Sequence, residues 1–344
     1  MLTLSIVIPV RNAEPTLPAC FAALERLSPP PHEIIFVDNA STDRTAEWLT
    51  GFQRALRPLP VTVLQERKLG ASAARNAGIR VATGDIVVFT DADCVPHRDW
   101  LAHMASPFVE AEVGAVAGTV TGLFGRSLYE LFSSLYTLQA PRGEKVYRAW
   151  TPWSGGFPTA NLAVRRSLLL KLEGFDEGKA IYGEDYDLCA RLYLEHVSIR
   201  HQPDAVVTHH HRTTLKGMLR QAYGFGRAHA YLLRRHRPPG LWLELPKHAV
   251  QWPRVPLHAW VDMASPDKKL AAFVLLACLS RPLFALVPLY LCWLAYDCRR
   301  RARSAGAGVS PLAAFGLAWM LLLKAAAMTA GRWLGSIRYG ACCL

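Results

Sequence analysis

The first hundred or so residues alternate between continuously apolar runs and segments with helical periodicity. The apolar runs cover residues 4–10, 33–38, 61–65 and 85–90. The helical segments between them cover residues 15–27, 42–56 and 72–82. Because the runs are apolar throughout and do not alternate, helices should cover both faces of the predicted strands. This rhythm predicts a doubly wound α/β domain built on a mostly parallel sheet.

The next part of the chain mixes short elements with loops. We expect a strand at 113–122, a helix at 123–140, an ordered loop at 150–160, and helices at 167–172 and from Gly183 to about residue 195. Two small strands are expected at 197–200 and 205–208, directly before His209, His210 and His211. The loop is rich in Trp, Gly and Pro, which is typical of a segment that lines a site.

Beyond residue 240 the pattern becomes strongly apolar. The apolar stretches are 270–280, 283–296 and 312–323. A membrane span needs about 20 apolar residues, so neither of the first two would cross alone. If 270–296 crossed as one span, the basic residues 299–303 would lie outside, against the positive-inside bias. Interfacial or re-entrant helices are therefore favoured, while two full spans and a soluble helical subdomain stay open.

Charge supports a division of the chain. The 344 residues carry a formal net charge of +12 and are 51% hydrophobic, which excludes a disordered protein. The basic clusters 234–237, 268–269 and 299–303 flank apolar segments, as anchors for lipid headgroups do. The first half lacks the interleaved aromatic and basic residues of a nucleic-acid platform, so no nucleic-acid partner is expected. We expect one domain at 1–235 and a helical, apolar and basic membrane-associated region at 236–344.

Cysteine usage and the start of the chain bear on location. The eight cysteines form no C-x-x-C pair and no repeated spacing, which favours a reducing compartment. Met1 leads directly into the first predicted strand, without a basic and then apolar leader. We therefore expect the protein at the cytoplasmic face of the cell membrane.

Two carboxylates stand at the end of the fourth apolar run. Residues 85–90 lead into Asp91-Ala92-Asp93, and open α/β sheets bind ligands at the carboxyl ends of their strands. Mg²⁺ and Mn²⁺ bind through one or two protein carboxylates together with substrate phosphates. The triplet therefore indicates a Mg²⁺ or Mn²⁺ site that carries a nucleoside diphosphate.

Further motifs follow in a fixed order. They are Ser5-Ile-Val-Ile-Pro-Val-Arg-Asn12, Val37-Asp-Asn-Ala-Ser-Thr-Asp43, Gly70-Ala-Ser-Ala-Ala-Arg-Asn-Ala-Gly78, Asp91-Ala-Asp93, Asn161-Leu-Ala-Val-Arg-Arg166 and Gly183-Glu-Asp-Tyr-Asp187. In this series the chain resembles the family 2 glycosyltransferases of the GT-A fold, bacterial cell-envelope type, from about residue 4 to about residue 235. The resemblance implies inverting, metal-dependent transfer of a sugar from a nucleotide-sugar donor, with a UDP-sugar favoured, to a lipid-linked or glycan acceptor.

The resemblance also implies roles for residues near the donor. Pro9 and Asp38 match positions that bind the nucleotide, and a carboxylate can accept a hydrogen bond from the imide N–H of uracil. Arg75 matches a position near the diphosphate, where a helix amino end adds a positive field. The residues alone leave other interpretations open, since Asp38 could be a capping acid and Arg75 a surface arginine of an amphipathic helix.

For catalysis, the resemblance implies that Asp91 and Asp93 hold the metal and that Asp185 is the general base. A base that deprotonates the acceptor hydroxyl in a single displacement implies inversion at the anomeric carbon. On composition alone, the acids Glu184, Asp185 and Asp187 could instead be helix amino-terminal charge.

A histidine could complete the metal shell, as in related GT-A enzymes. His211 is the candidate, together with His209, because the first and third members of the triplet share a face on an extended segment. A solvated loop is the alternative. Trp150, Trp153 and Gly155-Gly156-Phe157 could stack on an acceptor sugar or pack in the core. The stretch 220–227 departs from the Q-x-x-R-W motif of processive synthases, so polymer synthesis is not expected.

Two other function classes stay open. A nucleotidyltransferase acting on a sugar phosphate would have a glycine-rich loop after the first strand, but residues 10–15 contain no glycine. A catalytically silent membrane scaffold would not need acids at every matched position. The acceptor could be a polyprenyl phosphate, a lipid-linked glycan or a small glycoside.

Overall fold

The computed structural model divides the chain into two compact units. It describes residues 2–56, 58–122, 127–138, 141, 143–152, 154–178, 182–210, 214–237, 240–246, 249–255 and 258–344. The first unit consists of Met1–Thr121 and Leu138–His210, and the second of Gly122–Thr137 and His211–Leu344. By compactness the second unit therefore takes in residues 122–137 and begins again at residue 211, whereas the sequence analysis placed a single domain boundary after residue 235.

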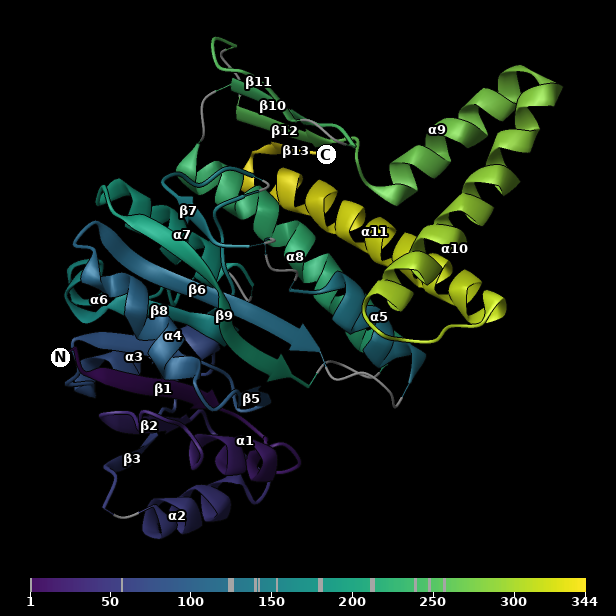
Figure 1. Ribbon diagram of the computed structural model, residues 1–344. Helices are drawn as coiled ribbons and strands as arrows, with labels where there is room; N and C mark the ends of the chain where they lie inside the picture. Colours follow the sequence, from purple (N-terminus) through teal and green to yellow (C-terminus); the bar gives the residue numbers. More distant parts are fainter. Residues whose placement is uncertain are drawn as a thin grey trace. The chain divides into compact units, whose positions relative to one another are not determined.

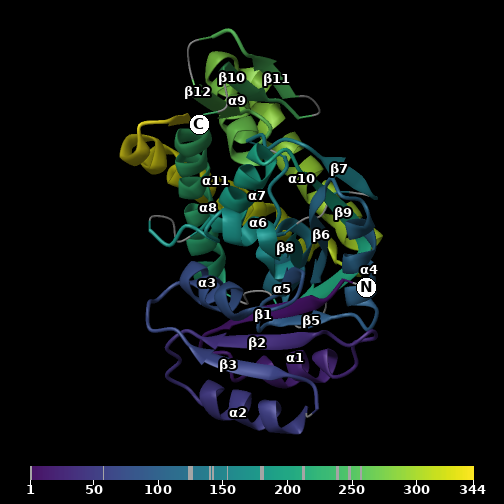
Figure 2. The ribbon, with the colours of Figure 1, turned by 90° about the vertical axis from the view of Figure 1, so that its left-hand side faces the viewer.

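The first unit is built on a mixed sheet whose strand order is β3-β2-β1-β4-β8-β6-β9-β5, with β7 paired to β9. The strands are β1 Leu4–Val10, β2 Glu33–Asp38, β3 Val61–Gln65, β4 Ile86–Phe89, β5 Cys94–Pro96, β6 Val113–Gly122, β7 Lys145–Tyr147, β8 Leu162–Arg165 and β9 Ser198–His209. The first four are mutually parallel, and Figure 2 shows β1, β2 and β3 side by side. Antiparallel pairs join β8 to β4 and to β6, and β9 to β5 and β7. The predicted α/β class and parallel-rich sheet are confirmed.

The last long strand differs from its prediction. Residues 197–200 and 205–208 were expected to form two small strands, but β9 runs unbroken from Ser198 to His209. The residues between the two expected strands are His201-Gln-Pro-Asp204. His201 is nevertheless fully buried, and its Nδ1 lies 2.8 Å from the carbonyl oxygen of Gly143. A satisfied buried histidine thus lets the strand continue.

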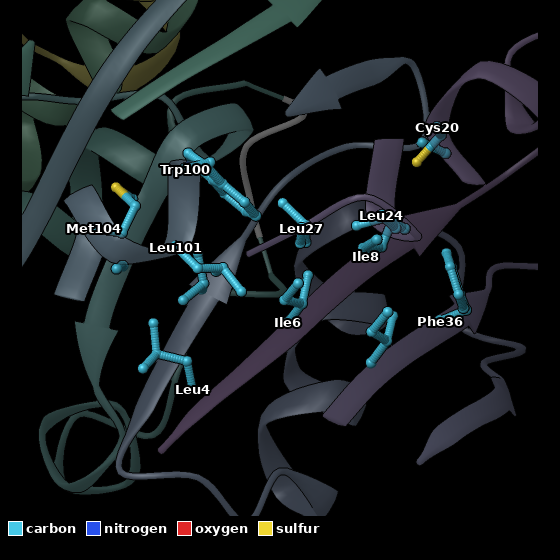
Figure 3. Close-up of a cluster of buried hydrophobic side chains, with 14 of the residues drawn as sticks. Leu4, Ile6, Ile8, Cys20, Leu24, Leu27, Phe36, Trp100, Leu101 and Met104 are labelled. Carbon is cyan, nitrogen blue, oxygen red and sulfur yellow. The ribbon is translucent and has the colours of Figure 1, made fainter. Parts of the chain in front are cut away.

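Helices cover both faces of this sheet because side chains alternate along each strand. The helices of the first unit are α1 Leu17–Leu24, α2 Thr45–Ala55, α3 Ala71–Val81, α4 Trp100–Ala105, α6 Arg166–Lys171 and α7 Glu184–Leu194. Leu4, Ile6 and Ile8 of β1 face a core formed with α1, α2 and α4 (Figure 3). Val7 faces the opposite core, formed with α3, α6 and α7. Strands that are buried on both sides explain the continuously apolar runs.

The second unit combines helices with a small sheet that the sequence analysis did not predict. Its helices are α5 Leu128–Tyr136, α8 Leu215–His236, α9 Pro266–Leu279, α10 Leu286–Ser304 and α11 Pro311–Tyr339. The strands β10 Gly240–Glu244, β11 Ala249–Trp252, β12 His258–Asp262 and β13 Cys342–Cys343 pair in the order β11-β10-β12-β13. A short 3₁₀ segment, Arg281–Ala285, separates α9 from α10, so residues 270–296 do not form one continuous helix.

Much of the apolar surface of this unit is exposed. No residue of α9 is buried. On α11, Leu312, Phe315, Trp319, Trp333 and Ile337 lie on one exposed face. Within the described residues, α11 is the helix long and apolar enough to cross a membrane, with a mean hydropathy of 1.7 over its most apolar window.

The opposite face of α11 packs closely against α8, and the two helices run side by side in Figure 1. A Cβ atom at Gly331 would overlap the carbonyl oxygen of Tyr223, and one at Gly226 would overlap the carbonyl oxygen of Met328. Gly335, one turn after Gly331, would bring a Cβ to 2.9 Å from that of Ala230. Small residues spaced four apart let two helix backbones approach closely.

We predict that Gly331→Ala lowers the free energy of unfolding by about 1–3 kcal/mol, because the added methyl group forces α8 and α11 apart. Gly51→Ala is the matched control, since this helical glycine has open space around its Cβ position. That control should be neutral or stabilising by about 0.5–1 kcal/mol. Urea unfolding of both variants measures the difference, and equal stability of Gly331→Ala and wild type would contradict the close packing.

Candidate active site

Polar side chains gather where β1, β2 and β4 end. Asp38 is the last residue of β2 and is 5% exposed. Its Oδ1 accepts a hydrogen bond from the backbone N–H of Ser41 at 3.1 Å, so it does stabilise the following turn. Pro9 of β1 is half-buried and lies in register with Val37, directly beside the end of β2. Both residues that were predicted to bind nucleotide thus lie at the same edge of the sheet.

Asn39 fixes the loop that leads into α3, and sequence reasoning missed it. Its amide nitrogen donates to the carbonyl oxygens of Glu66 and Lys68 at 3.0 and 2.8 Å. Its amide oxygen accepts from the N–H of Gly70 at 2.8 Å. Gly70 has φ +135°, a backbone conformation that residues with a side chain rarely adopt. The start of α3 is therefore held against the end of β2.

Arg75 is a buried connection between three elements and not a surface arginine. Only 4% of the residue is exposed. Its guanidinium donates to Asp91 at 2.9 Å and to Glu184 at 3.1 Å, and its carbon lies 5.6 Å from the centre of the Phe175 ring. Burial disfavours the charge, but Asp91, Glu184 and Asp185 outweigh it and raise the pKa of Arg75.

The turn before α7 is anchored to α3. Asn76 donates to the carbonyl oxygen of Phe175 at 2.9 Å and accepts from the Phe175 N–H at 2.8 Å. Gly174 has φ +70°, and its carbonyl oxygen accepts from Arg191 of α7 at 2.7 Å. These bonds fix the position from which α7 begins, and with it the acids of its first turn.

Four side chains that can bind a cation meet after β4. Ligand atoms of Asp91, Asp93, Cys94 and His209 all lie within 4.8 Å of one another. The Nε2 of His209 lies 3.4 Å from Oδ1 of Asp93. Burial raises the pKa of Asp93, His209 opposes this shift, and Asp91 adds to it. Two carboxylates and an imidazole suit a divalent cation such as Mn²⁺ or Mg²⁺.

Strand pairing explains which histidine reaches this cluster. In the antiparallel β5–β9 pair, Cys94 lies opposite His209, and the N–H of His210 donates to the carbonyl oxygen of Asp93 at 2.9 Å. His211, which was predicted as the metal ligand together with His209, lies outside the described residues. Cys94 was missed, although its place directly after Asp93 was a signal.

Asp185 stands in the first turn of α7, after Gly183 with φ +89°. Burial, followed by the nearby charge of Glu184, raises the pKa of Asp185 to about 7, and Arg75 works in the opposite direction. A carboxyl group that ionises near neutral pH is suited to proton transfer. The two neighbours thus differ in their surroundings, because Glu184 forms an ion pair with Arg75 while Asp185 has a raised pKa.

A cavity of about 310 Å³ lies next to α7 in the first unit. Its described lining includes Tyr147, Thr151, Gly155-Gly156-Phe157 and Tyr186, the residue after Asp185. A Cβ at Gly156 would overlap the Tyr186 ring, so this glycine lets the ring lie against the loop. Trp150 is half-buried and packs against the core, and Trp153 lies outside the described residues.

Comparisons with known proteins agree with this geometry. Residues 5–172 match the family model described as glycosyl transferase family 2. The pre-mycofactocin glycosyltransferase of Mycobacterium tuberculosis strain H37Rv is 30% identical over 236 residues, which are 67% of this chain and 48% of that protein. The undecaprenyl-phosphate 4-deoxy-4-formamido-L-arabinose transferase of Yersinia enterocolitica is 34% identical over 133 residues, 38% of this chain and 40% of that protein. The chain thus spans about half the length, or less, of these curated relatives.

One solved structure resembles nearly the whole chain. The mannosyltransferase PcManGT from Pyrobaculum calidifontis, in complex with GDP-Man and Mn²⁺, has a TM-score of 0.57 at 22% identity. The alignment covers 97% of this chain and 87% of that chain. This likeness confirms the predicted GT-A fold.

The raised pKa of Asp185 predicts a pH dependence of stability. Because the folded protein holds this proton up to about pH 7 and the unfolded chain releases it near the ordinary value of 3.8, stability should fall as pH rises between these values. Asp185→Asn removes the ionisation and should therefore gain stability relative to wild type at pH 8, by about 1 kcal/mol or more, and lose that advantage toward pH 4. Urea unfolding across this range measures it.

Glu184→Gln serves as the companion variant. Glu184 raises the pKa of Asp185, so this variant should have a lower pKa at Asp185. The pH range over which its stability falls should therefore end at a lower pH than in the wild type. A stability difference between Asp185→Asn and wild type that does not vary with pH would contradict the assignment.

Proposed function

Through residues 5–172 the chain belongs to glycosyl transferase family 2, and on this premise we propose that it transfers a sugar from a nucleoside diphosphate sugar to an acceptor at the cytosolic face of a membrane. The observation that carries the proposal is the meeting of the Asp91/Asp93 pair with Glu184 and Asp185 around the buried Arg75, in the same unit as Asp38. The names of the relatives support nucleotide-sugar chemistry for a chain of this family.

At the donor end, Asp38 accepts from the imide N–H of the base, which favours uracil or thymine. Pro9 borders the same edge of the sheet. The two terminal nitrogens of Arg75 bind Glu184 and Asp91, so we assign it a positioning role toward these acids. Its charge lies close enough to Asp91 to favour a diphosphate nearby.

Asp91, Asp93 and one histidine, His209 or His211, would hold a divalent cation. Bound there, Mg²⁺ or Mn²⁺ supplies positive charge that offsets the charge of the departing diphosphate. Asp93 and His209 fit this task because they face each other at 3.4 Å on neighbouring elements. Asp91 is held by Arg75 on one oxygen, which orients the other.

Asp185 acts as the general base toward the acceptor hydroxyl. Its pKa of about 7 lets it be ionised at neutral pH and still accept a proton in the reaction. One base and one leaving group correspond to a single displacement, so the anomeric configuration inverts. The cavity is lined by Tyr186, the residue after this base, and offers space for the acceptor.

The acceptor is proposed to be lipid-linked. The Yersinia relative is named for undecaprenyl phosphate, which supports a lipid acceptor. The second unit exposes apolar side chains along α9, α10 and α11, and α10 ends in the basic residues 299–303. An apolar surface beside basic side chains suits an anionic membrane surface.

Donor hydrolysis tests the reaction class. We expect purified protein with Mn²⁺ or Mg²⁺ to release one nucleoside diphosphate from a panel of UDP-, GDP-, dTDP- and ADP-sugars, with UDP favoured. Asp93→Asn should abolish release, and Asp185→Asn should lower transfer about 100-fold or more. Asp99→Asn is the control, because this exposed acid lies at the start of α4 and outside the site. Pyrophosphate release from a nucleoside triphosphate would instead support a nucleotidyltransferase.

Vesicle binding tests the membrane surface. Trp319→Asp should weaken binding to phosphatidylglycerol vesicles about tenfold or more, because a charge replaces an apolar side chain on the exposed face of α11. Trp48→Asp is the control, since Trp48 is an exposed tryptophan of the first unit, 38% exposed against 59% for Trp319. Cosedimentation at low and high salt measures both, and equal loss in the two variants would contradict the assignment.

A further inference from the structure

The cation cluster contains a sulfur atom that the proposed function does not use. Cys94 follows Asp93 directly, and its Sγ lies 3.8 Å from Oδ1 of Asp93. The same sulfur lies within 4.8 Å of the ligand atoms of Asp91 and His209. We propose that Cys94 is a ligand of the cation at this site, so that the site binds thiophilic divalent ions such as Zn²⁺, Co²⁺ and Cd²⁺ more tightly than Mg²⁺.

The spacing of the four atoms fits a shared ion. Metal bonds to oxygen, nitrogen and sulfur are about 2.0–2.3 Å long, so two ligand atoms on opposite sides of an ion lie up to about 4.5 Å apart. A set in which every pair lies within 4.8 Å needs only small side-chain adjustments to close on one ion. The inference rests on the proposed metal role of this site.

The backbone fixes Cys94 in place. Its N–H donates to the carbonyl oxygen of Asp91 at 3.0 Å, which closes the turn between the two acids and β5. Pairing of β5 with β9 then sets Cys94 opposite His209. Because these bonds are made by the main chain, replacing the sulfur atom leaves the scaffold of the site intact.

The surroundings of the thiol keep water away from it. Cys94 is fully buried and packs with Ala160 and Val207. A dry wall on one side and two carboxylates on the other strengthen the attraction for a cation. When an ion binds, a metal–sulfur bond replaces the S–H bond and the proton leaves to the solvent.

The chemistry of the ligand atoms decides which ions bind most tightly at this site. Carboxylates suit Mg²⁺ and Mn²⁺, imidazole suits many transition metals, and thiolate favours soft ions. A set of two carboxylates, one imidazole and one thiolate therefore discriminates against Mg²⁺. Cys20 provides a comparison within the same unit, because it is equally buried but lies outside the four-atom group.

Absorption spectroscopy with metal ions alone tests the proposal. In a background where the exposed Cys278, Cys292 and Cys342 are serine, Cd²⁺ should produce thiolate-to-metal charge-transfer absorption in the ultraviolet. Cys94→Ser should remove that absorption and weaken Cd²⁺ binding about 10–100-fold, while Mg²⁺ binding changes less than about threefold. Cys20→Ser should leave the absorption unchanged.

Other outcomes overturn the proposal. Calorimetric binding of Cd²⁺ without thiolate absorption would show that the ion is bound without the sulfur of Cys94. Failure of Cd²⁺ to bind would show that the four side chains do not form a site for a thiophilic ion. Persistence of the absorption in Cys94→Ser would assign it to another thiol. If Cys94→Ser does not fold, Asp93→Asn keeps the thiol and should raise the Cd²⁺ concentration for half-maximal absorption about tenfold.

The two proposals fail separately. Loss of donor hydrolysis in Asp93→Asn without thiolate absorption in the parent protein would leave the proposed function standing and sink the role of Cys94. Thiolate absorption from a protein that hydrolyses no nucleotide sugar would support the role of Cys94 and contradict the proposed function.

Discussion

The buried guanidinium of Arg75 is the interaction on which the site depends. It joins α3 to the acid after β4 and to the acid that begins α7, at 2.9 and 3.1 Å. Burying a charge costs several kcal/mol unless its partners are well placed, so this arrangement persists only because the surrounding backbone is fixed. Asn39 supplies that rigidity through a hydrogen bond to the loop before α3, and Asn76 through one to the turn before α7. Three segments far apart in sequence thereby meet at one edge of the sheet.

The same guanidinium places the acids in different environments. Asp91 and Glu184 are engaged by Arg75, whereas Asp93 faces His209 and Asp185 carries a pKa of about 7. Neighbouring carboxylates in like positions would repel one another and titrate together. The guanidinium between Asp91 and Glu184 offsets part of this repulsion, so the acids after β4 and those that begin α7 can lie on either side of one side chain. The ordered motifs suggest different roles for these acids through the resemblance, but the contacts of Arg75 that separate them cannot be read from the sequence.

The sequence predicts those features that depend on local pattern and leaves out those that depend on long-range pairing. The four parallel strands were predicted at nearly the observed bounds, because strands buried on both faces must be apolar throughout. The strand β9 was divided in two because its buried His201 is satisfied by a residue far away in the chain. Cys94 and His209 become neighbours only through the register of β5 on β9, which no motif specifies. In the small sheet β10 to β13, the pairing of β13 with β12 joins segments about eighty residues apart, which local pattern cannot predict, whereas β10, β11 and β12 lie close together in sequence and were also missed.

In the second unit, one face of the apolar helix α11 packs against α8 while the opposite face is exposed. Glycine contacts bring the backbones of α11 and α8 close together at Gly226, Gly331 and Gly335. Larger residues of α11 such as Leu317 and Leu322 are buried in the core of the same unit, while Leu312, Phe315 and Trp319 stand on the exposed face. Packing through small residues does not rely on the hydrophobic effect and remains effective when the outer face meets lipid. Close glycine contacts on one face of α11 and exposed large apolar residues on the other thus let the unit be compact and still present an apolar surface.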